Sequence, residues 1–106
     1  MTLGIGISGG LQIVPLDLSD NTLCDLLVQH VMKHCQSVLQ IDATFEGLID
    51  GKIEIGLNGK TYTLKLKIKV RIGDAYVVKI VLVKLFFPFV GFPSVVSFEY
   101  LEEINI

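Results

Sequence analysis

The stretch that decides the fold is residues 61–92, TYTLKLKIKVRIGDAYVVKIVLVKLFFPFVGF. In its first part, from Thr61 to Ile72, apolar residues alternate with threonine, lysine and arginine, a pattern typical of a β-strand with one face in the core. The dipeptide Gly73-Asp74 then predicts a tight turn into a second strand. This order of strand, turn and strand predicts an antiparallel hairpin at the centre of the protein.

The second strand of this hairpin, Ala75 to Leu85, is apolar on both faces. One face would carry Val77, Val81 and Val83. The other face would carry a second apolar row, Tyr76, Val78, Ile80 and Leu82. A sheet with one face in water would leave that second row exposed. We therefore expect something to cover it, which could be a second copy of the chain, another partner or an apolar ligand.

Length and composition predict a single domain that associates with itself. The chain has 106 residues, enough for one domain (1–106) with a real core. Apolar residues make up 51% and charged residues only 19%, which leaves few polar groups for the surface of a monomer. The net charge is -2, so the chain has no positive field to attract nucleic acid. We expect a homo-oligomer and do not expect nucleic acid as a partner.

A long amphipathic helix is expected from Leu23 to Gln40. Its apolar residues recur every three to four positions and cover about half of the helix circumference. The segment from Asp17 to Thr22 is rich in residues that cap helix amino termini. Two short extended segments precede it, residues 3–7 and 11–16.

The part of the chain after the helix has the turn signals of an antiparallel meander. Asp50-Gly51 and Asn58-Gly59 predict two more tight turns, and the segment from Ser94 to Ile106 predicts a last strand at or near the sheet edge. A two-residue loop at Asn58-Gly59 would place Ile55 opposite Tyr62. The sequence therefore predicts an α+β fold, in which one amphipathic helix packs on an antiparallel four- to five-strand meander.

One strand irregularity is expected near Gly47. Strict pairing through an Asp50-Gly51 turn would place Glu46 opposite Ile55, a charged residue against an apolar one. A β-bulge at Gly47 would correct this by bringing Phe45 to the inner face.

The helix also carries the residues that could form a metal or redox site. His30 and His34 are four residues apart and could share a metal with a third ligand, but no general base lies between them and both border the apolar face. Cys24 and Cys35 would lie about 16 Å apart along the helix axis, too far for one disulfide. We expect buried thiols and no metal.

No pattern in the sequence predicts catalysis or a cofactor. The glycine-rich residues 4–9 fit a dinucleotide-binding spacing, but extended rather than helical sequence follows them. The cysteines lie on the apolar face of the helix, where desolvation disfavours a thiolate nucleophile. We therefore expect a protein without catalytic residues or cofactor. Without a visible secretory signal or a membrane-spanning run, we expect it in the cytoplasm.

A row of cations follows the alternating strand. The row consists of Lys65, Lys67, Lys69 and Arg71, with neighbours about 7 Å apart on one strand face. It could be a solvated or salt-bridged face, or it could contact an anionic partner such as lipid, nucleic acid or an acidic protein. The same lysines would also discourage aggregation through a sheet edge.

Aromatic residues cluster between two prolines near the end of residues 61–92. The cluster consists of Phe86, Phe87, Phe89 and Phe92, with Pro88 and Pro93 beside them. Proline disrupts a regular ladder, so this segment is expected to be a loop. The loop could fold back over the core, form an oligomer contact, or act as a tip that touches a membrane or gates a ligand.

Together these features predict a small non-enzymatic structural or interaction protein that forms a homo-oligomer through an apolar sheet face. The residues expected at the interface are Tyr76, Val78, Ile80, Leu82, Phe86, Phe87, Phe89 and Phe92. The alternative is a binding module that encloses a lipid-like or other small apolar ligand between helix and sheet.

Overall fold

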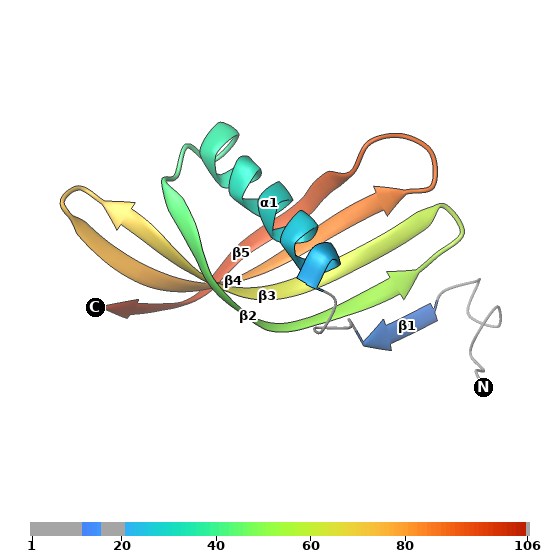
Figure 1. The fold of residues 1–106 in the computed structure, drawn as a ribbon, viewed down its shortest axis with the longest axis horizontal. Helices are drawn as coiled ribbons and strands as arrows, with labels where there is room; N and C mark the ends of the chain where they lie inside the picture. Colours follow the sequence, from blue (N-terminus) through green and yellow to red (C-terminus); the bar gives the residue numbers. More distant parts are fainter. Residues whose placement is uncertain (1–11, 16–20, 106) are drawn as a thin grey trace.

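The structure is a computed structural model that describes residues 12–15 and 21–105 (Figure 1). In this part of the chain it contains one helix and five strands: β1 (Gln12–Pro15), α1 (Asn21–Ser37), β2 (Ala43–Ile55), β3 (Gly59–Ile72), β4 (Ala75–Pro88) and β5 (Ser94–Asn105). The predicted α+β fold is confirmed. The segment 3–7 and the glycine pattern at 4–9 lie outside the described residues.

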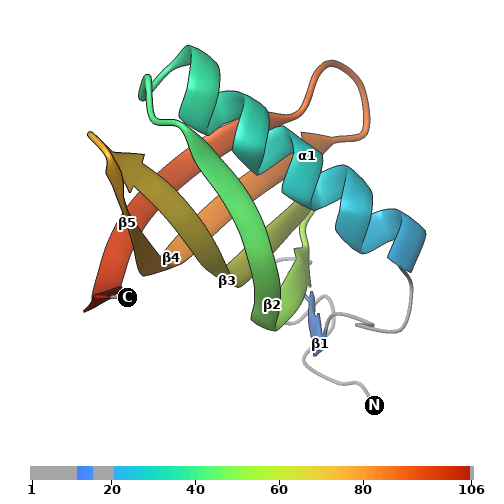
Figure 2. The ribbon, with the colours of Figure 1, turned by 60° about the vertical axis from the view of Figure 1, so that its left-hand side comes forward.

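The five strands form one antiparallel sheet in the order β1-β2-β3-β4-β5. α1 connects β1 to β2 and lies across one face of the sheet, as the two views in Figures 1 and 2 show. The sheet bends and twists around the helix. The strand face under α1 is called the inner face below, and the opposite one the outer face.

The core forms between α1 and the inner face. The side chains that are fully buried there come from all three central elements: Leu27, Val31 and Cys35 of α1, Leu64, Leu66 and Ile68 of β3, and Val81, Val83 and Leu85 of β4. Each buried aliphatic side chain of this size contributes about 1.5–3 kcal/mol of hydrophobic free energy. The apolar residues of the alternating pattern in 61–72 therefore lie on the inner face of β3, as the sequence predicts.

The predicted turn at Asp50-Gly51 is wrong, because β2 runs through it as one strand from Ala43 to Ile55. The expected bulge is present: the register shifts between Phe45 and Gly47, and Phe45 lies opposite Ile68 of the inner face. A second shift follows between Leu48 and Asp50. The two bulges locally interrupt the ladder and bend the strand, whereas Gly51 pairs regularly with Leu64 and makes no chain reversal.

The register of the β2–β3 connection also differs from the prediction, by two residues. Ile55 lies opposite Lys60 and not Tyr62, because the loop consists of residues 56–58 and Gly59 already belongs to β3. A Cβ at Gly59 would lie 2.5 Å from the carbonyl oxygen of Phe87, so the glycine permits close approach to β4. The slip equals two residues, which keeps every side chain on its predicted face.

At the other end of β3, Gly73 and Asp74 form the two-residue turn that the sequence predicts, and Gly73 has a φ of 62°. The predicted helix is correct in place but begins at Asn21 and ends at Ser37. β5 forms one edge of the sheet.

Candidate functional site

The outer apolar row of β4 is largely buried within the single chain. Val78 and Ile80 are only 7% and 6% exposed, Leu82 is half-buried, and Tyr76 is exposed. The cross-strand neighbours of Val78 and Ile80 are Lys69 and Lys67 on β3 and Ile104 and Glu102 on β5. The long stems of such side chains can lie along apolar surface while their charged ends reach water. Most of the row therefore needs no second layer from outside.

The cationic row on the outer face of β3 makes few charged contacts. The Lys69 Nζ atom lies 5.0 Å from the ring centroid of Tyr76, in a cation–π contact. Among the described residues, the ion pair within 4 Å joins Lys79 and Glu103, at 3.6 Å, and involves none of this row. The four cations Lys65, Lys67, Lys69 and Arg71 thus extend along the face without a carboxylate partner in the described chain.

Four large apolar side chains are exposed together at one end of the sheet. We call them the apolar tip: Leu57 (77% exposed) in the β2–β3 loop, and Phe89 (61%), Val90 (91%) and Phe92 (92%) in the β4–β5 loop. The amide of Phe89 donates a hydrogen bond to the carbonyl oxygen of Asn58, at 3.2 Å, and so joins the two loops. The tip is therefore a single surface built from two connected loops.

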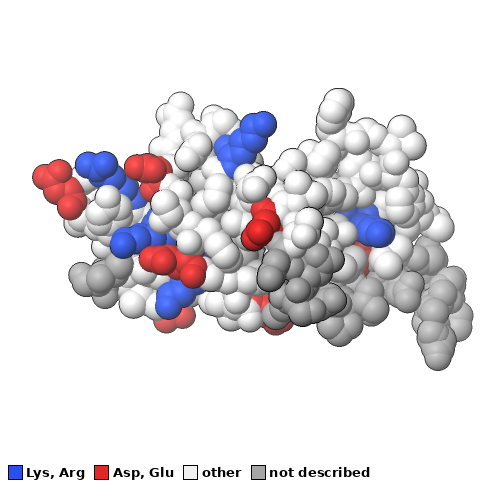
Figure 3. Space-filling model, viewed as in Figure 1, with Lys and Arg blue, Asp and Glu red and all other residues white. Residues whose placement is uncertain are grey.

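Charge is distributed unevenly along the molecule. In Figure 3 the charged side chains gather at the left, toward the β3–β4 hairpin, whereas the opposite end, toward the tip, is mostly white. The segments that lead to the tip, 55–66 and 84–98, contain three lysines and no acidic residue. The tip is thus an apolar end with no acidic residue in these two adjoining segments.

The predicted aromatic cluster divides among three places. Phe86 and Phe87 belong to β4, which runs on to Pro88, so the expected break before Phe86 is wrong. Phe87 packs on the inner side, with ring centroids 5.2 Å from Tyr62 and 5.7 Å from His30. Phe86 is half-buried on the outer face. Phe89 and Phe92 alone among the eight predicted interface residues form part of the tip.

Two tip residues were not chosen from the sequence. Val90 lies inside the aromatic segment but carries no ring, and Leu57 lies in a different turn. The available signal was a leucine at the centre of Gly56-Leu57-Asn58, where a loop position usually carries a polar residue. Their proximity depends on the pairing of Gly59 with Pro88, which brings the two loops to one end.

A hollow of about 250 Å³ lies on the outer face of the sheet. It is lined by Asp50, Gly51, Lys52, Thr63, Lys65 and Leu82. Thr63 is only 9% exposed, and its Oγ1 atom is buried without a hydrogen-bond partner. Leaving a buried hydroxyl unsatisfied costs about 1–3 kcal/mol. Among the described residues, Thr63 Oγ1 is the one buried side-chain nitrogen or oxygen atom that has no hydrogen-bond partner.

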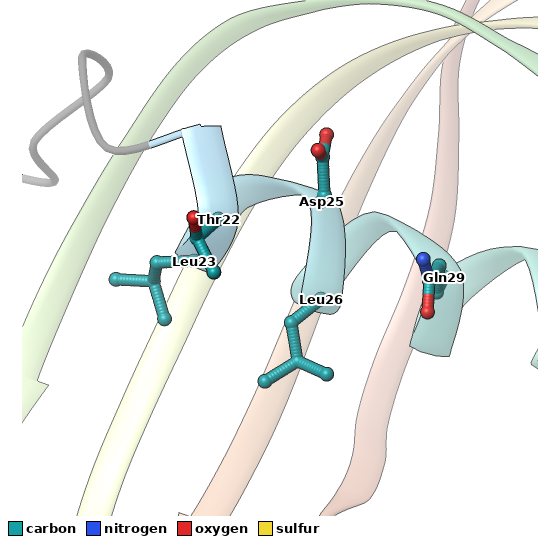
Figure 4. Close-up of a pocket in the computed structure, with 5 residues that line it drawn as sticks. All are labelled: Thr22, Leu23, Asp25, Leu26 and Gln29. Atoms are coloured by element: carbon teal, nitrogen blue, oxygen red, sulfur yellow. The ribbon is translucent and has the colours of Figure 1, made fainter.

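A second hollow, of about 520 Å³, lies beside the first turns of α1. Its described lining consists of Thr22, Leu23, Asp25, Leu26 and Gln29 (Figure 4). Leu23 and Leu26 point to the same side of the helix, whereas Asp25 points away from them. These residues come from one helical segment and do not converge on a common point, so they define no chemical site.

The two helix histidines border the core as expected. His30 lies near Phe87, and His34 stacks on Phe98 with ring centroids 5.9 Å apart. Both side chains are half-buried. Within the described residues, no group of three potential ligands could hold a metal ion. The histidines thus have a packing role in this structure.

Both cysteines are buried, and Cys35 has no exposed surface. Burial raises the pKa of the Cys35 thiol to about 11, because the thiolate would lose its hydration. Burial also raises the pKa of Tyr62 and of Tyr100. A thiol with this pKa is a poor nucleophile near neutral pH.

We expect the thermal midpoint to fall as the pH rises from about 9 to about 11. The Cys35 thiol of the unfolded chain ionises near pH 8.5, whereas the folded one stays protonated up to about pH 11. As the pH rises, the Cys35 thiol loses its proton in the unfolded state before it does so in the folded state. The contribution of the buried thiol to the free energy of unfolding is therefore complete below about pH 8 and declines above it. Melting curves by circular dichroism would measure this, and Cys35→Ala should show a shallower decline. An equal decline in both proteins would contradict the assignment to Cys35.

No helix in the described parts of the chain is long and apolar enough to cross a bilayer. Comparisons with protein-family models, with curated proteins and with solved structures found no match to this chain.

Proposed function

We propose that this chain is a small non-enzymatic interaction protein that forms a homo-oligomer through the apolar tip. The observation that carries the proposal is the exposure of Leu57, Phe89, Val90 and Phe92 on two loops that are hydrogen-bonded to each other. Contiguous apolar patches on soluble proteins commonly mark interaction sites. The low share of charged residues, 19%, supports the same conclusion.

The size of the tip supports a second copy as its occupant. If a phenylalanine carries roughly 200 Å² of surface, the four side chains together expose on the order of 500 Å². This area is near the upper end for the largest apolar patch of a monomer, and it is more than half of the ~800 Å² that each partner buries in a stable complex. Half-buried Phe86 and the backbone of the two loops can supply the remainder. Contact of the same patch on two copies would form a two-fold dimer.

The charge of the protein favours a second copy over an anionic membrane. The chain carries a net charge of -2, and of the three lysines in segments 55–66 and 84–98, Lys65 and Lys84 lie on the outer face whereas Lys60 follows the β2–β3 loop at the tip. Because these two segments contain no acidic residue, two tips can meet without opposing carboxylates from them. The proposal places the protein in the cytoplasm, where two buried thiols are ordinary.

A ligand between helix and sheet receives less support. Fully buried side chains of α1, such as Leu27 and Val31, meet fully buried side chains of β3 and β4 across that interior. A lipid-like ligand there would have to displace the core. We therefore prefer self-association to the enclosed-ligand function.

Chemical cross-linking tests the proposed contact. The buried cysteines give a background of low reactivity, so Val90→Cys supplies an accessible thiol at the tip. We expect a short bis-maleimide to join most Val90→Cys chains in pairs. The matched control is Tyr76→Cys, which is exposed at the opposite end of the sheet and should remain single. Equal yields at the two positions would contradict the tip contact.

A further inference from the structure

We propose that the outer-face hollow binds an oxyanion of the phosphate class. This site is distinct from the apolar tip and goes beyond self-association. Its residues combine cationic side chains with a buried hydroxyl that has no partner, which is the donor set that a phosphate ester needs. We name it the Thr63 site, after Thr63 and the lysines around it, Lys52, Lys65 and Lys84.

The strand register brings these groups together. Thr63 on β3 lies directly opposite Lys52 on β2 and Lys84 on β4, so all three share one cross-strand row of the outer face. Directly opposite residues in such rows have Cβ atoms about 5 Å apart. Lys65 follows Thr63 by two residues on the same face and lines the hollow. Three ammonium groups can therefore reach one point above the threonine.

The charged groups of the Thr63 site include carboxylates as well as lysines. In the part of the chain that the structure describes, none of its three lysines has a carboxylate within 4 Å. The acid that lines the hollow, Asp50, accepts a hydrogen bond from the Gly51 amide, at 2.8 Å from Oδ1. The lining carries two cations, Lys52 and Lys65, and one anion, Asp50, whereas Lys84 of β4, Glu54 of β2 and Glu99 of β5 flank the hollow on the same face. Because the Oγ1 atom of Thr63 is itself buried, the proposal requires a change of its χ1 rotamer that turns the hydroxyl into the hollow, where an anion would supply the missing partner.

The volume and the lining of the hollow favour a phosphate that carries a small organic group. Its volume is about 250 Å³, more than an inorganic phosphate fills, and Leu82 forms an apolar part of the wall. A phosphate ester with a small organic group would fit both features, with the phosphate on the lysines and the organic part on Leu82. The same chemistry occurs in free phosphate esters and in lipid headgroups.

The test is a binding titration on the full chain at constant ionic strength. The probes are inorganic phosphate, glycerol phosphate and vesicles of phosphatidylglycerol, each followed by the chemical shifts of Thr63 and Lys65. We expect saturable binding that Thr63→Val weakens about tenfold, because the valine keeps the shape but has no hydroxyl. Lys65→Gln should weaken it by a similar factor. Asp50→Asn should strengthen binding, because it removes the one negative charge of the lining.

The control variant is Lys33→Gln, which removes an exposed cation from the helix and should leave binding unchanged. Saturable binding of the soluble phosphates would identify a free ester as the ligand, and binding of the vesicles alone would identify a headgroup. The proposal would be overturned if no probe bound, or if Thr63→Val and Lys65→Gln bound as tightly as the wild type. Loss of binding in Lys33→Gln to the same extent would overturn it too, since it would indicate a nonspecific charge effect. None of these results depends on the oligomeric state.

Discussion

Ile80→Asp is expected to destabilise the protein strongly, although Ile80 lies on the sheet face opposite the helix. Its side chain is only 6% exposed, between Lys67 of β3 and Glu102 of β5. A carboxylate at this position would be taken out of water without sufficient compensation from one neighbouring lysine. We expect a loss of at least about 3 kcal/mol from a total stability of roughly 5–15 kcal/mol. Urea unfolding followed by circular dichroism would measure it.

The matched control for this change is Val96→Asp on the edge strand β5. Val96 is exposed, so its replacement should alter the free energy of unfolding by about 0.5 kcal/mol or less. If Ile80→Asp were as stable as the wild type, the outer row would be accessible surface. Self-association through the sheet face itself, as the sequence predicts, would then again be the better hypothesis.

The double variant Phe89→Asp with Phe92→Asp should stay folded and lose assembly. Both rings are exposed in the single chain, so their loss removes little from the core. Four carboxylates would meet across the proposed two-fold contact, where they would repel one another and remain poorly hydrated. We expect the double substitution to weaken the affinity between two chains by at least a hundredfold. The melting temperature of the monomeric variant should show that its chain remains folded. Sedimentation velocity and circular dichroism measure the two quantities.

Tyr76→Asp serves as the control for that double variant, because Tyr76 is an exposed aromatic residue at the far end of the sheet. It should leave assembly intact. A double variant that still assembled would remove the tip from the interface. Unfolding of the double variant as a monomer would instead place Phe89 or Phe92 in the core of the chain.

The sequence predicts the central elements well because their signals are local. Alternation in 61–72 identifies the inner face of β3, and the Gly73-Asp74 pair forms the expected two-residue turn. The helix follows from its apolar period and differs only at its ends. These features depend on neighbours along the chain, so no knowledge of tertiary structure is needed to find them.

The predictions are wrong where one sequence pattern is compatible with two different local structures. A glycine can reverse the chain, but Gly51 lies within a bulged strand and Gly59 permits a close approach to Phe87. Proline usually ends a strand, yet β4 reaches Pro88. Each choice depends on the partner strand, which the local sequence does not specify.

The candidate site was only partly predictable for the same reason. Phe89 and Phe92 were among the predicted interface residues, but the outer row of β4 was expected to need a cover. Val78 and Ile80 are buried, and the cross-strand register places lysines of β3 and residues of β5 beside them, whose side-chain stems can cover apolar surface. The location of Leu57 beside the aromatic loop, and the lysines around Thr63, likewise appear only when distant segments are paired.

The native mass of the wild-type protein tests the central claim most directly. One copy has a mass of 11.7 kDa. At micromolar concentration, sedimentation equilibrium should give twice that value, and dilution should lower it toward a single copy. A mass of one copy over the whole concentration range would contradict the proposal that the apolar tip joins two chains.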